Sequence, residues 1–560
     1  MRPHIGARAL LRGGSLLRAP LRKRSKSVIV ASDIIFLAGA VLMGFAKTSS
    51  QLIVGRSVVG IAIGVASIVV PVYIAEVSPK NIRAMLVVLF SLQIGVGLVL
   101  AFVGGFAFTV TSMGWRLILA APAVPAVLQL LAMTFLPESP RWLAHSGRLA
   151  EADVVMRSLT AVPGASPEER APPAPGDEEI ESELREVYRE GKYLRTPEGM
   201  QEAWNLRPRP IATQLAIGVG LSCLHSLAGA RTIMYYSLEI ISMAGFISEL
   251  AMMQAIFTMG SFGTIGLMCG FFLIDRVGRR VLALVSGVGT AVCLFTLAAS
   301  FSLAARHSPG SVNVPGVGDA CPVGAAGPIT TCQSCLASSC GYCALPPGIP
   351  GQYHEFPGHC FAGVASGNVS ALEACSTMGG NMKLYTTGCP SGFGWMSMGA
   401  LCLFQTFFQL GLGLIPAVVN AEYYPARVRG LCNGIAVSSN WLSNFFVSGT
   451  FLTLVALLGT PATFGLYGAL VAVGTLLLAF YLPETSGLSF PEIQALFEVY
   501  GTPGAPPVWR LHEGRPKVDK ADREKLVPSS HAAQPAGGAP PAGPGCDYCG
   551  VATCDGRCRL

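Results

Sequence analysis

The chain has 560 residues, of which 51% are hydrophobic and only 13% are charged, a composition too apolar for an ordinary soluble enzyme of this size. Its formal net charge is +7. Much of the positive excess lies between Arg2 and Lys26, so the charge does not indicate nucleic-acid binding and no nucleic-acid partner is expected. The apolar residues instead gather in runs that are long enough to cross a bilayer, which takes about 20 residues of helix.

Ten such runs follow one another, and each is expected to form a transmembrane helix. They are residues 28–46, 52–75, 85–107, 116–136, 211–235, 250–274, 281–303, 394–419, 431–456 and 462–482. The basic segment 1–26 favours a cytosolic N-terminus, because positive residues concentrate on that side of a membrane; its Arg-rich, acid-free composition is also typical of a transit peptide. We expect an all-α, multi-pass protein embedded in a lipid bilayer, with both ends inside. The plasma membrane is the expected location, and the vacuole or another endomembrane is the alternative.

Alternation of the spans places segment 304–393 outside the cytosol, and its composition agrees. An even number of cysteines in such a segment predicts up to four disulfides, whose pairing the sequence leaves open. The cysteines are Cys321, Cys332, Cys335, Cys340, Cys343, Cys360, Cys375 and Cys389. The sequon at Asn368 is a glycosylation acceptor on that side only. We expect a small disulfide-bonded module at 321–389 that could present a surface to an extracellular partner.

Two further parts are expected to be soluble. Segment 137–210 reads as a cytosolic linker with surface helices near 147–159 and 177–192, separated by a stretch rich in Pro, Ala and Gly. The tail 501–560 is rich in Pro, Gly and Ala and is expected to be disordered. It ends in four cysteines, Cys546, Cys549, Cys554 and Cys558. Free thiols or lipidation sites are favoured there over a zinc site, because the central spacing is short for a zinc ribbon.

A repeated motif divides the chain into two halves. Glu76-x-x-Pro79-x-x-x-Arg83 is followed by Pro137-Glu138-Ser139, and Glu422-x-x-Pro425-x-x-x-Arg429 is followed by Pro483-Glu484-Thr485. In each copy the second glutamate lies 62 positions after the first. A parallel internal repeat of this kind is typical of two-lobed transporters.

With these repeats, the loop Asp275-Arg-Val-Gly-Arg-Arg280 and the run Pro137-Glu-Ser-Pro-Arg-Trp-Leu143, the chain resembles the sugar-porter branch of the major facilitator superfamily over about 27–500. Cys340-Gly-Tyr-Cys343 and Gly388-Cys-Pro-Ser-Gly-Phe393 look like the plexin-semaphorin-integrin-like loop of plant-type proton/myo-inositol transporters. The resemblance implies proton symport of a polyol or hexose, myo-inositol first, by alternating access. The domains that it implies are a basic segment (1–26), a first lobe of four helices (27–136), a linker (137–210), three helices of a second lobe (211–303), the external loop (304–393), three more helices (394–500) and the tail (501–560).

Charges of both signs recur at corresponding cytosolic helix ends of the two halves. We expect them to form a cytosolic gate whose pairs separate when that side opens, since partly solvated ion pairs are individually weak. The alternative is that they only anchor the topology. The residues are Glu76, Arg83, Glu138, Asp275, Arg279, Glu422, Arg429 and Glu484.

The expected substrate site departs from the family pattern. Where the family has Gln-Gln-x-x-Gly-x-Asn, this chain has 225–231, so two amides and an asparagine are missing; a family asparagine falls on Gly263 and a tryptophan on Ala417. A neutral polyol needs several convergent neutral donors and acceptors, so its binding should be weaker. The candidate residues are His225, Ser226, Arg231, Thr232, Tyr235, Tyr236, Asn440, Trp441 and Asn444.

Arg231 has two interpretations. An arginine in an apolar span usually faces a water-filled cavity or a counter-charge, which suggests an anionic or otherwise different solute, with His225 as a protonatable neighbour. Alternatively, transport has been lost and Arg231 snorkels toward the outer surface.

The start of the chain also separates two functions. Two helices precede the Asp275–Arg280 loop, whereas only Arg22-Lys23-Arg24 remains where the first lobe should have its own loop, so the family's proton-linked aspartate on the first helix has no position here. We expect a shortened form of a twelve-helix protein; a natural ten-span protein is the alternative. The rival to a transporter is a transport-deficient sensor or truncated product that displays the external module. No nucleophile–base or metal constellation lies within the spans, so no enzyme activity, cofactor or metal is expected.

Overall fold

The computed structural model of the chain divides into two compact units, residues 1–512 and 513–560, and every described residue belongs to the first. The described ranges are 25–78, 83–108, 113–160, 209–246, 248–313, 329–338, 340–344, 358–361, 382–386, 388–486 and a few single residues or pairs between 185 and 497. Residues 1–24 of the predicted basic N-terminal segment, the tail and the four tail cysteines lie outside these ranges.

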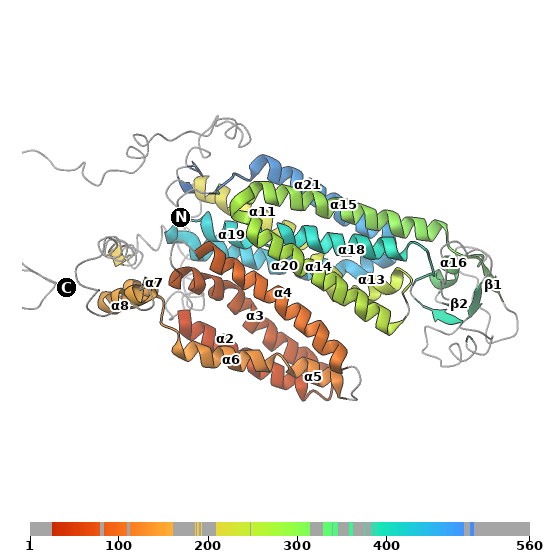
Figure 1. The fold of residues 1–560 in the computed structure, drawn as a ribbon, viewed down its shortest axis with the longest axis horizontal. Coiled ribbons are helices and arrows are strands. Elements are labelled where there is room, and N and C mark those ends of the chain that lie inside the picture. Colours follow the sequence, from red (N-terminus) through yellow and green to blue (C-terminus); the bar gives the residue numbers. More distant parts are fainter. Residues whose placement is uncertain are drawn as a thin grey trace, which may run out of the picture. The chain divides into compact units, whose positions relative to one another are not determined.

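The first lobe is a bundle of helices (Figure 1). Its members are α2 (Ser25–Gly44), α3 (Ser49–Val77), α4 (Arg83–Phe108), α5 (Gly114–Ala120) and α6 (Ala123–Phe135). Thr48 begins α3 by accepting a hydrogen bond from the backbone N–H of Gln51 on its side chain, at 3.3 Å. Helix α2 packs against α3, α5 and α6, and α3 packs against α4.

The second lobe has more helices because it contains six of the ten spans and two of these are broken. It comprises α11 (Arg209–Leu227), α12 (Ala230–Tyr235), α13 (Ser237–Met243), α14 (Glu249–Val277), α15 (Arg279–Arg306), α18 (Gly394–Leu410), α19 (Ile415–Glu422), α20 (Ala426–Leu458) and α21 (Thr460–Tyr481). Helix α15 packs against α18 and α21, α14 against α18, and α11 against α20. The largest buried apolar cluster of the described residues lies among these helices.

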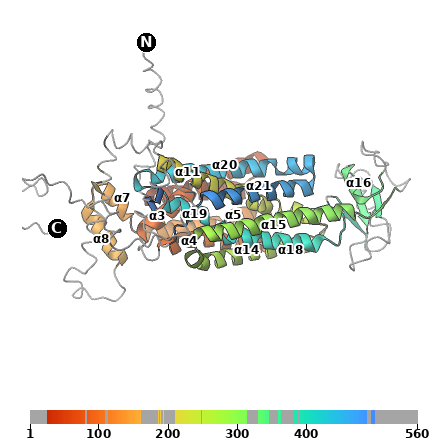
Figure 2. The same ribbon diagram turned by 90° about the horizontal axis from the view of Figure 1, so that it is seen from above.

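The two lobes meet along α4 and α14, with weaker contacts of α20 with α3 and of α19 with α4. Both views show α4 beside α14, the short helices α7 and α8 at one end of the bundle and α16 at the opposite end (Figures 1 and 2). Segments that were expected on opposite sides of the membrane therefore lie at opposite ends of the helices.

Nine stretches of the described residues are long and apolar enough to cross a membrane. They correspond to nine of the ten predicted spans. The remaining predicted span, 85–107, falls on α4, a helix of 26 residues whose described apolar portion is Leu92–Gly105. The fold is that of a multi-pass helical membrane protein, as predicted.

Part of the predicted linker is helical. Helix α7 (Pro140–His145) begins where the Ser139 side chain accepts a hydrogen bond from the backbone N–H of Trp142 at 3.1 Å. Helix α8 (Leu149–Thr160) confirms the surface helix predicted near 147–159 and packs against α7. Most of the second predicted helix, 177–192, lies outside the described residues.

The external segment contains a small sheet that the sequence did not lead us to expect. Strands β1 (Ser311–Asn313), β3 (Gly358–Phe361), β2 (Gly341–Ala344) and β4 (Lys383–Tyr385) pair in that order, with helix α16 (Cys332–Ala337) packed against β2 and β3. Tyr342 is fully buried: its hydroxyl donates to the Gly310 carbonyl at 2.9 Å and accepts from the Gly358 N–H at 3.0 Å. Burial raises the pKa of Tyr342, so the phenol stays protonated and able to donate.

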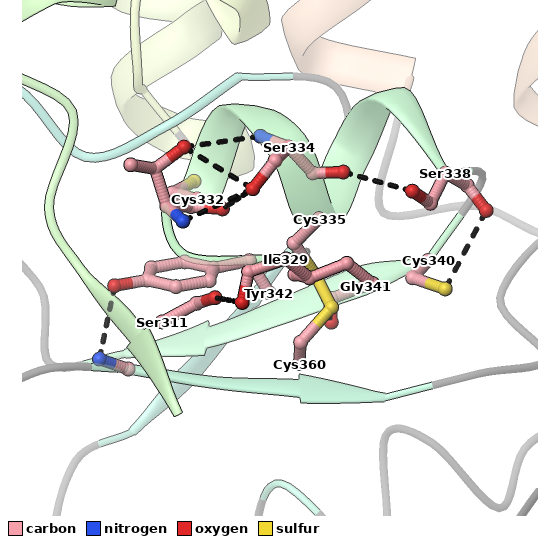
Figure 3. The surroundings of a disulfide bond; sticks show 12 residues. Ser311, Ile329, Cys332, Ser334, Cys335, Ser338, Cys340, Gly341, Tyr342 and Cys360 are labelled. Atoms are coloured by element: carbon pink, nitrogen blue, oxygen red, sulfur yellow. Dashed lines mark hydrogen bonds between the residues drawn. A yellow bond between two sulfur atoms is a disulfide. The ribbon is translucent and has the colours of Figure 1, made fainter. Parts of the chain in front are cut away.

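Disulfides hold this module together, and Figure 3 shows the surroundings of the one between Cys335 and Cys360. The bonded pairs among the described residues are Cys332–Cys389, Cys335–Cys360 and Cys343–Cys375. Cys340 is also disulfide-bonded. The prediction of a disulfide-bonded module is confirmed for these seven cysteines. Cys321 and the predicted glycosylation site Asn368 lie outside the described residues, so glycosylation stays a prediction.

We expect the Cys335–Cys360 bond to be essential for the module, because it ties α16 to β3, one of the two inner strands of the sheet. The double variant C335S/C360S should destabilise the module by about 2–4 kcal/mol, as is usual for removal of a native disulfide. Peptide mapping of the non-reduced protein should find Cys332–Cys389, Cys335–Cys360 and Cys343–Cys375 in the native chain, and non-native disulfides or free thiols in the variant. Replacing the exposed thiol Cys269 on α14 by serine is the control and should change nothing in the map. Native bonds that persist in the double variant would contradict the prediction.

Candidate transport site and cytosolic gate

At the end of the second lobe where α15 begins, Glu484 caps a helix. One of its carboxylate oxygens accepts from the backbone N–H of Arg279 at 2.8 Å, and the other accepts from the N–H of Arg280 at 3.0 Å. The first oxygen also accepts from the N–H groups of Thr485 and Ser486, both at 3.1 Å. A carboxylate at a helix N-terminus satisfies free N–H groups and complements the helix dipole.

Glu422 belongs to the same cluster. Its carboxylate forms an ion pair with the Arg279 guanidinium at 3.1 Å and accepts from the Thr485 hydroxyl at 3.2 Å. The Arg279 side chain also donates to the Ser486 hydroxyl at 3.0 Å. All these groups lie in the second lobe, so the Arg279–Glu422 ion pair is internal to that lobe. Our gate hypothesis had expected such pairs to bridge the two lobes, and for this pair it was wrong.

The first lobe repeats the arrangement with its own motif residues. The Ser139 hydroxyl donates to Glu76 at 2.6 Å, as Thr485 does to Glu422. Glu138 accepts from the backbone N–H of Lys26 at 3.1 Å, at the start of α2. The repeat in the sequence is therefore also a repeat in hydrogen bonding.

Arg429 and Glu76 interact electrostatically between the lobes at this end. Arg429 lies in the first turn of α20, where its Nε donates to the Tyr424 carbonyl at 3.2 Å. It is close enough to Glu76, in the last turn of α3, to interact electrostatically with that carboxylate. The side chains of Arg83 and Asp275, which we also predicted in the gate, lie outside what the structure describes.

The predicted substrate site lies where a span of the second lobe is interrupted. Helix α11 ends at Leu227 and α12 begins at Ala230, with Gly229 between them at φ +74°. This left-handed conformation suits glycine because a side chain would be strained there. Broken helices of this kind are typical of transporter binding sites, since they leave polar groups available within the membrane.

Arg231 follows the interruption and is held by helix α20. Its guanidinium donates to the Asn440 side-chain oxygen at 2.8 Å and stacks on the Trp441 ring at 4.9 Å. The Trp441 indole N–H in turn donates to the Ser67 hydroxyl on α3 of the first lobe, at 3.3 Å. The predicted residues Arg231, Asn440 and Trp441 therefore come together, and they do so at the boundary between the lobes.

His225 and Ser226 anchor the end of α11. The His225 Nδ1 lies 2.8 Å from the Leu412 carbonyl oxygen, so this nitrogen carries the ring proton and donates. The ring packs on Phe408 with centroids 5.1 Å apart. The Ser226 hydroxyl donates to the Asn440 carbonyl at 2.8 Å. Both residues lie beside the Arg231 cluster, but their side-chain hydrogen bonds hold helices together.

Of the other predicted residues, some hold helices together and others are available to a ligand. The Thr232 and Tyr236 hydroxyls each bond to Ser448 on α20 at 3.0 Å. Tyr235 is 60% exposed. Asn444 lies one turn beyond Asn440, is buried, and makes no hydrogen bond to any described residue, so its amide is available to a ligand.

Comparison with known proteins shows the family of the chain. The family model described as Sugar (and other) transporter matches residues 22–321 and 362–497. The chain belongs to the sugar transporter family. Among its relatives are Probable inositol transporter 2 of Arabidopsis thaliana, 35% identical with 84% of this chain and 79% of the relative covered, and the Proton myo-inositol cotransporter of Homo sapiens, 34% identical with 88% and 74% covered.

The fold of this sugar transporter family member is that of the major facilitator superfamily. A solved proton:xylose symporter, XylE, superposes with a TM-score of 0.58 at 19% identity, covering 84% of this chain and 83% of the symporter. An inward-open structure of the xylose transporter XylE from E. coli superposes with a TM-score of 0.52 at 18% identity, covering 84% and 83%. These comparisons confirm both the family and the fold that the sequence indicated.

Sequence reasoning missed two polar residues that lie next to Gly263, the position where the family has an asparagine. A side chain at Gly263, where the family asparagine was expected, would contact Gln405 and Gln409 of α18. The Gln405 side-chain oxygen is buried without a hydrogen-bond partner. Two amides therefore lie next to the position of the lost one. The sequence signal that could have revealed them is that both glutamines interrupt the apolar run 394–419.

Proposed function

We propose that the protein is a secondary active transporter that moves a polyol or hexose together with a proton by alternating access, with myo-inositol as the first candidate. The family membership supports the transport, and the proton and inositol named in its relatives support the solute and the coupling. The observation that carries the proposal is the polar cluster at the Gly229 interruption, because it lies where α3 and α20 of opposite lobes meet.

The two ends of the molecule would play different parts in the cycle. The cluster around Arg231, Asn440 and Asn444 would hold the solute between the lobes. At the cytosolic end, Glu484 and Glu138 would keep each lobe rigid, while the weak contact between Arg429 and Glu76 would open and close. Rocking of two rigid lobes around a fixed site is the usual form of alternating access.

Uptake into cells tests this proposal. Cells that express the full chain at their surface should accumulate labelled myo-inositol or a hexose above control cells, more strongly at acidic external pH, and a protonophore should abolish the gain. The rise at acidic pH is expected because a proton gradient directed inward drives a symporter. Surface labelling confirms that the protein is present. No uptake of any neutral polyol, hexose or sugar acid by surface-exposed protein would sink the proposed function.

A further inference from the structure

Arg231 is a cation near the end of a membrane span, and among the described residues it has no acidic partner. It lies within the apolar stretch Pro210–Tyr235, and no carboxylate of the described residues forms an ion pair with it. Its electrostatic neighbours are His225 and the Tyr235 phenol. An ionised side chain at this depth is costly unless a counter-charge or water stabilises it.

The guanidinium is also fixed in place. Asn440 accepts one of its N–H groups at 2.8 Å, and the Asn440 amide itself donates to the Ser222 carbonyl at 2.8 Å. The Trp441 ring covers one face of the guanidinium. A guanidinium has five N–H groups, so several remain to bind a ligand. Asn440 and Trp441 hold this arginine toward the lobe boundary, which differs from an arginine that snorkels to the outer surface.

We propose that Arg231 makes this site selective for a polyol that carries a single carboxylate, such as a hexuronic acid. A guanidinium binds a carboxylate through two parallel N–H···O bonds, which the free donors of Arg231 allow. A monoanion matches the single cation of the described site, whereas a phosphate dianion would be only half neutralised. The free Asn444 amide, one helical turn from Asn440, is placed to bind a hydroxyl of the same solute. The inference rests on the proposed transport function.

The experiment compares D-glucuronate with myo-inositol and D-glucose in cells that express the full chain. Labelled glucuronate should be taken up, and unlabelled glucuronate should compete at least ten-fold better than glucose, which lacks only the carboxylate. Arg231→Gln keeps a donor but removes the charge, and should lower glucuronate affinity at least ten-fold more than it lowers the affinity for neutral solutes. Arg231→Lys keeps the charge and should restore part of the glucuronate affinity.

Controls separate this inference from misfolding and from the proposed function. Arg306→Gln removes an exposed positive charge at the C-terminal end of α15 and should leave the affinities for glucuronate and for neutral solutes unchanged. Surface labelling shows whether each variant reaches the cell surface. The shift in denaturation temperature that glucuronate causes in the purified variants tests binding without transport. If myo-inositol is transported while glucuronate neither binds nor competes, this inference is wrong and the proposed function stands. If Arg231→Gln lowers both affinities equally, the arginine is structural and the inference is also wrong.

Discussion

Replacing Glu484 by glutamine is expected to lower transport at least ten-fold and to destabilise the second lobe by about 2 kcal/mol, the usual value of hydrogen bonds to a charged group. The carboxylate accepts four backbone N–H groups, from Arg279, Arg280, Thr485 and Ser486. An amide can offer only one oxygen, and its NH2 group would face an N–H donor. The start of α15 would therefore lose hydrogen bonds that no other described group provides.

The tight backbone at this point strengthens the expectation. Gly278, directly before α15, has φ +98°, and a Cβ there would lie 2.5 Å from the Glu484 carboxylate. The loop and the carboxylate thus fit each other closely. Heat denaturation of the purified protein and uptake by cells are the measurements. Glu239→Gln, on an exposed position of α13, is the matched control and should leave both unchanged. A Glu484→Gln variant as stable and active as the control would contradict this role.

The equivalence of the two motifs followed from the sequence, because a repeated spacing can be recognised without knowing which residues are in contact. The spacing of the two motifs predicted that Glu76 and Glu422 are equivalent, and their hydrogen bonds to Ser139 and Thr485 agree. The partners themselves did not follow. Tyr73 donates to the Pro137 carbonyl and Tyr423 to the Pro483 carbonyl, at 2.6 and 3.2 Å. The two tyrosines occupy different offsets from their glutamates, so no comparison of the repeats would have paired them.

The spans were predictable, but their interruptions were not. Residues 211–235 and 394–419 read as single apolar runs, yet α11 ends before Gly229 and α18 ends before Gly411. Hydropathy averaged over a window cannot report the dihedral angles of one glycine. The strands of the external module were also missed, because disulfides stabilise them in place of an alternating apolar pattern.

Replacing Arg429 by alanine is expected to shift the protein toward its inward-open state by about 1 kcal/mol, or roughly five-fold, the upper value for a partly solvated ion pair. Arg429 of the second lobe and Glu76 of the first interact electrostatically. In the proposed gate this attraction is lost when the cytosolic side opens. Expression and membrane insertion should persist, because Arg429 lies in the first turn of α20 and is only partly buried. A mutation moves such an equilibrium only through a different effect on its two states.

Cytosolic access to the site reports the shift. A cysteine in place of Asn444 should react several-fold faster with a membrane-impermeant thiol reagent, applied to the cytosolic face of inside-out vesicles, when Arg429 is alanine. The vesicles without the introduced cysteine give the background from Cys269 and the other thiols. Glu76→Gln should cause the same increase, and the double variant should add little, because both changes remove one interaction. Arg306→Ala is the control and should have no effect. If neither Arg429→Ala nor Glu76→Gln changes the rate, these charges only anchor the helix ends and do not gate the site.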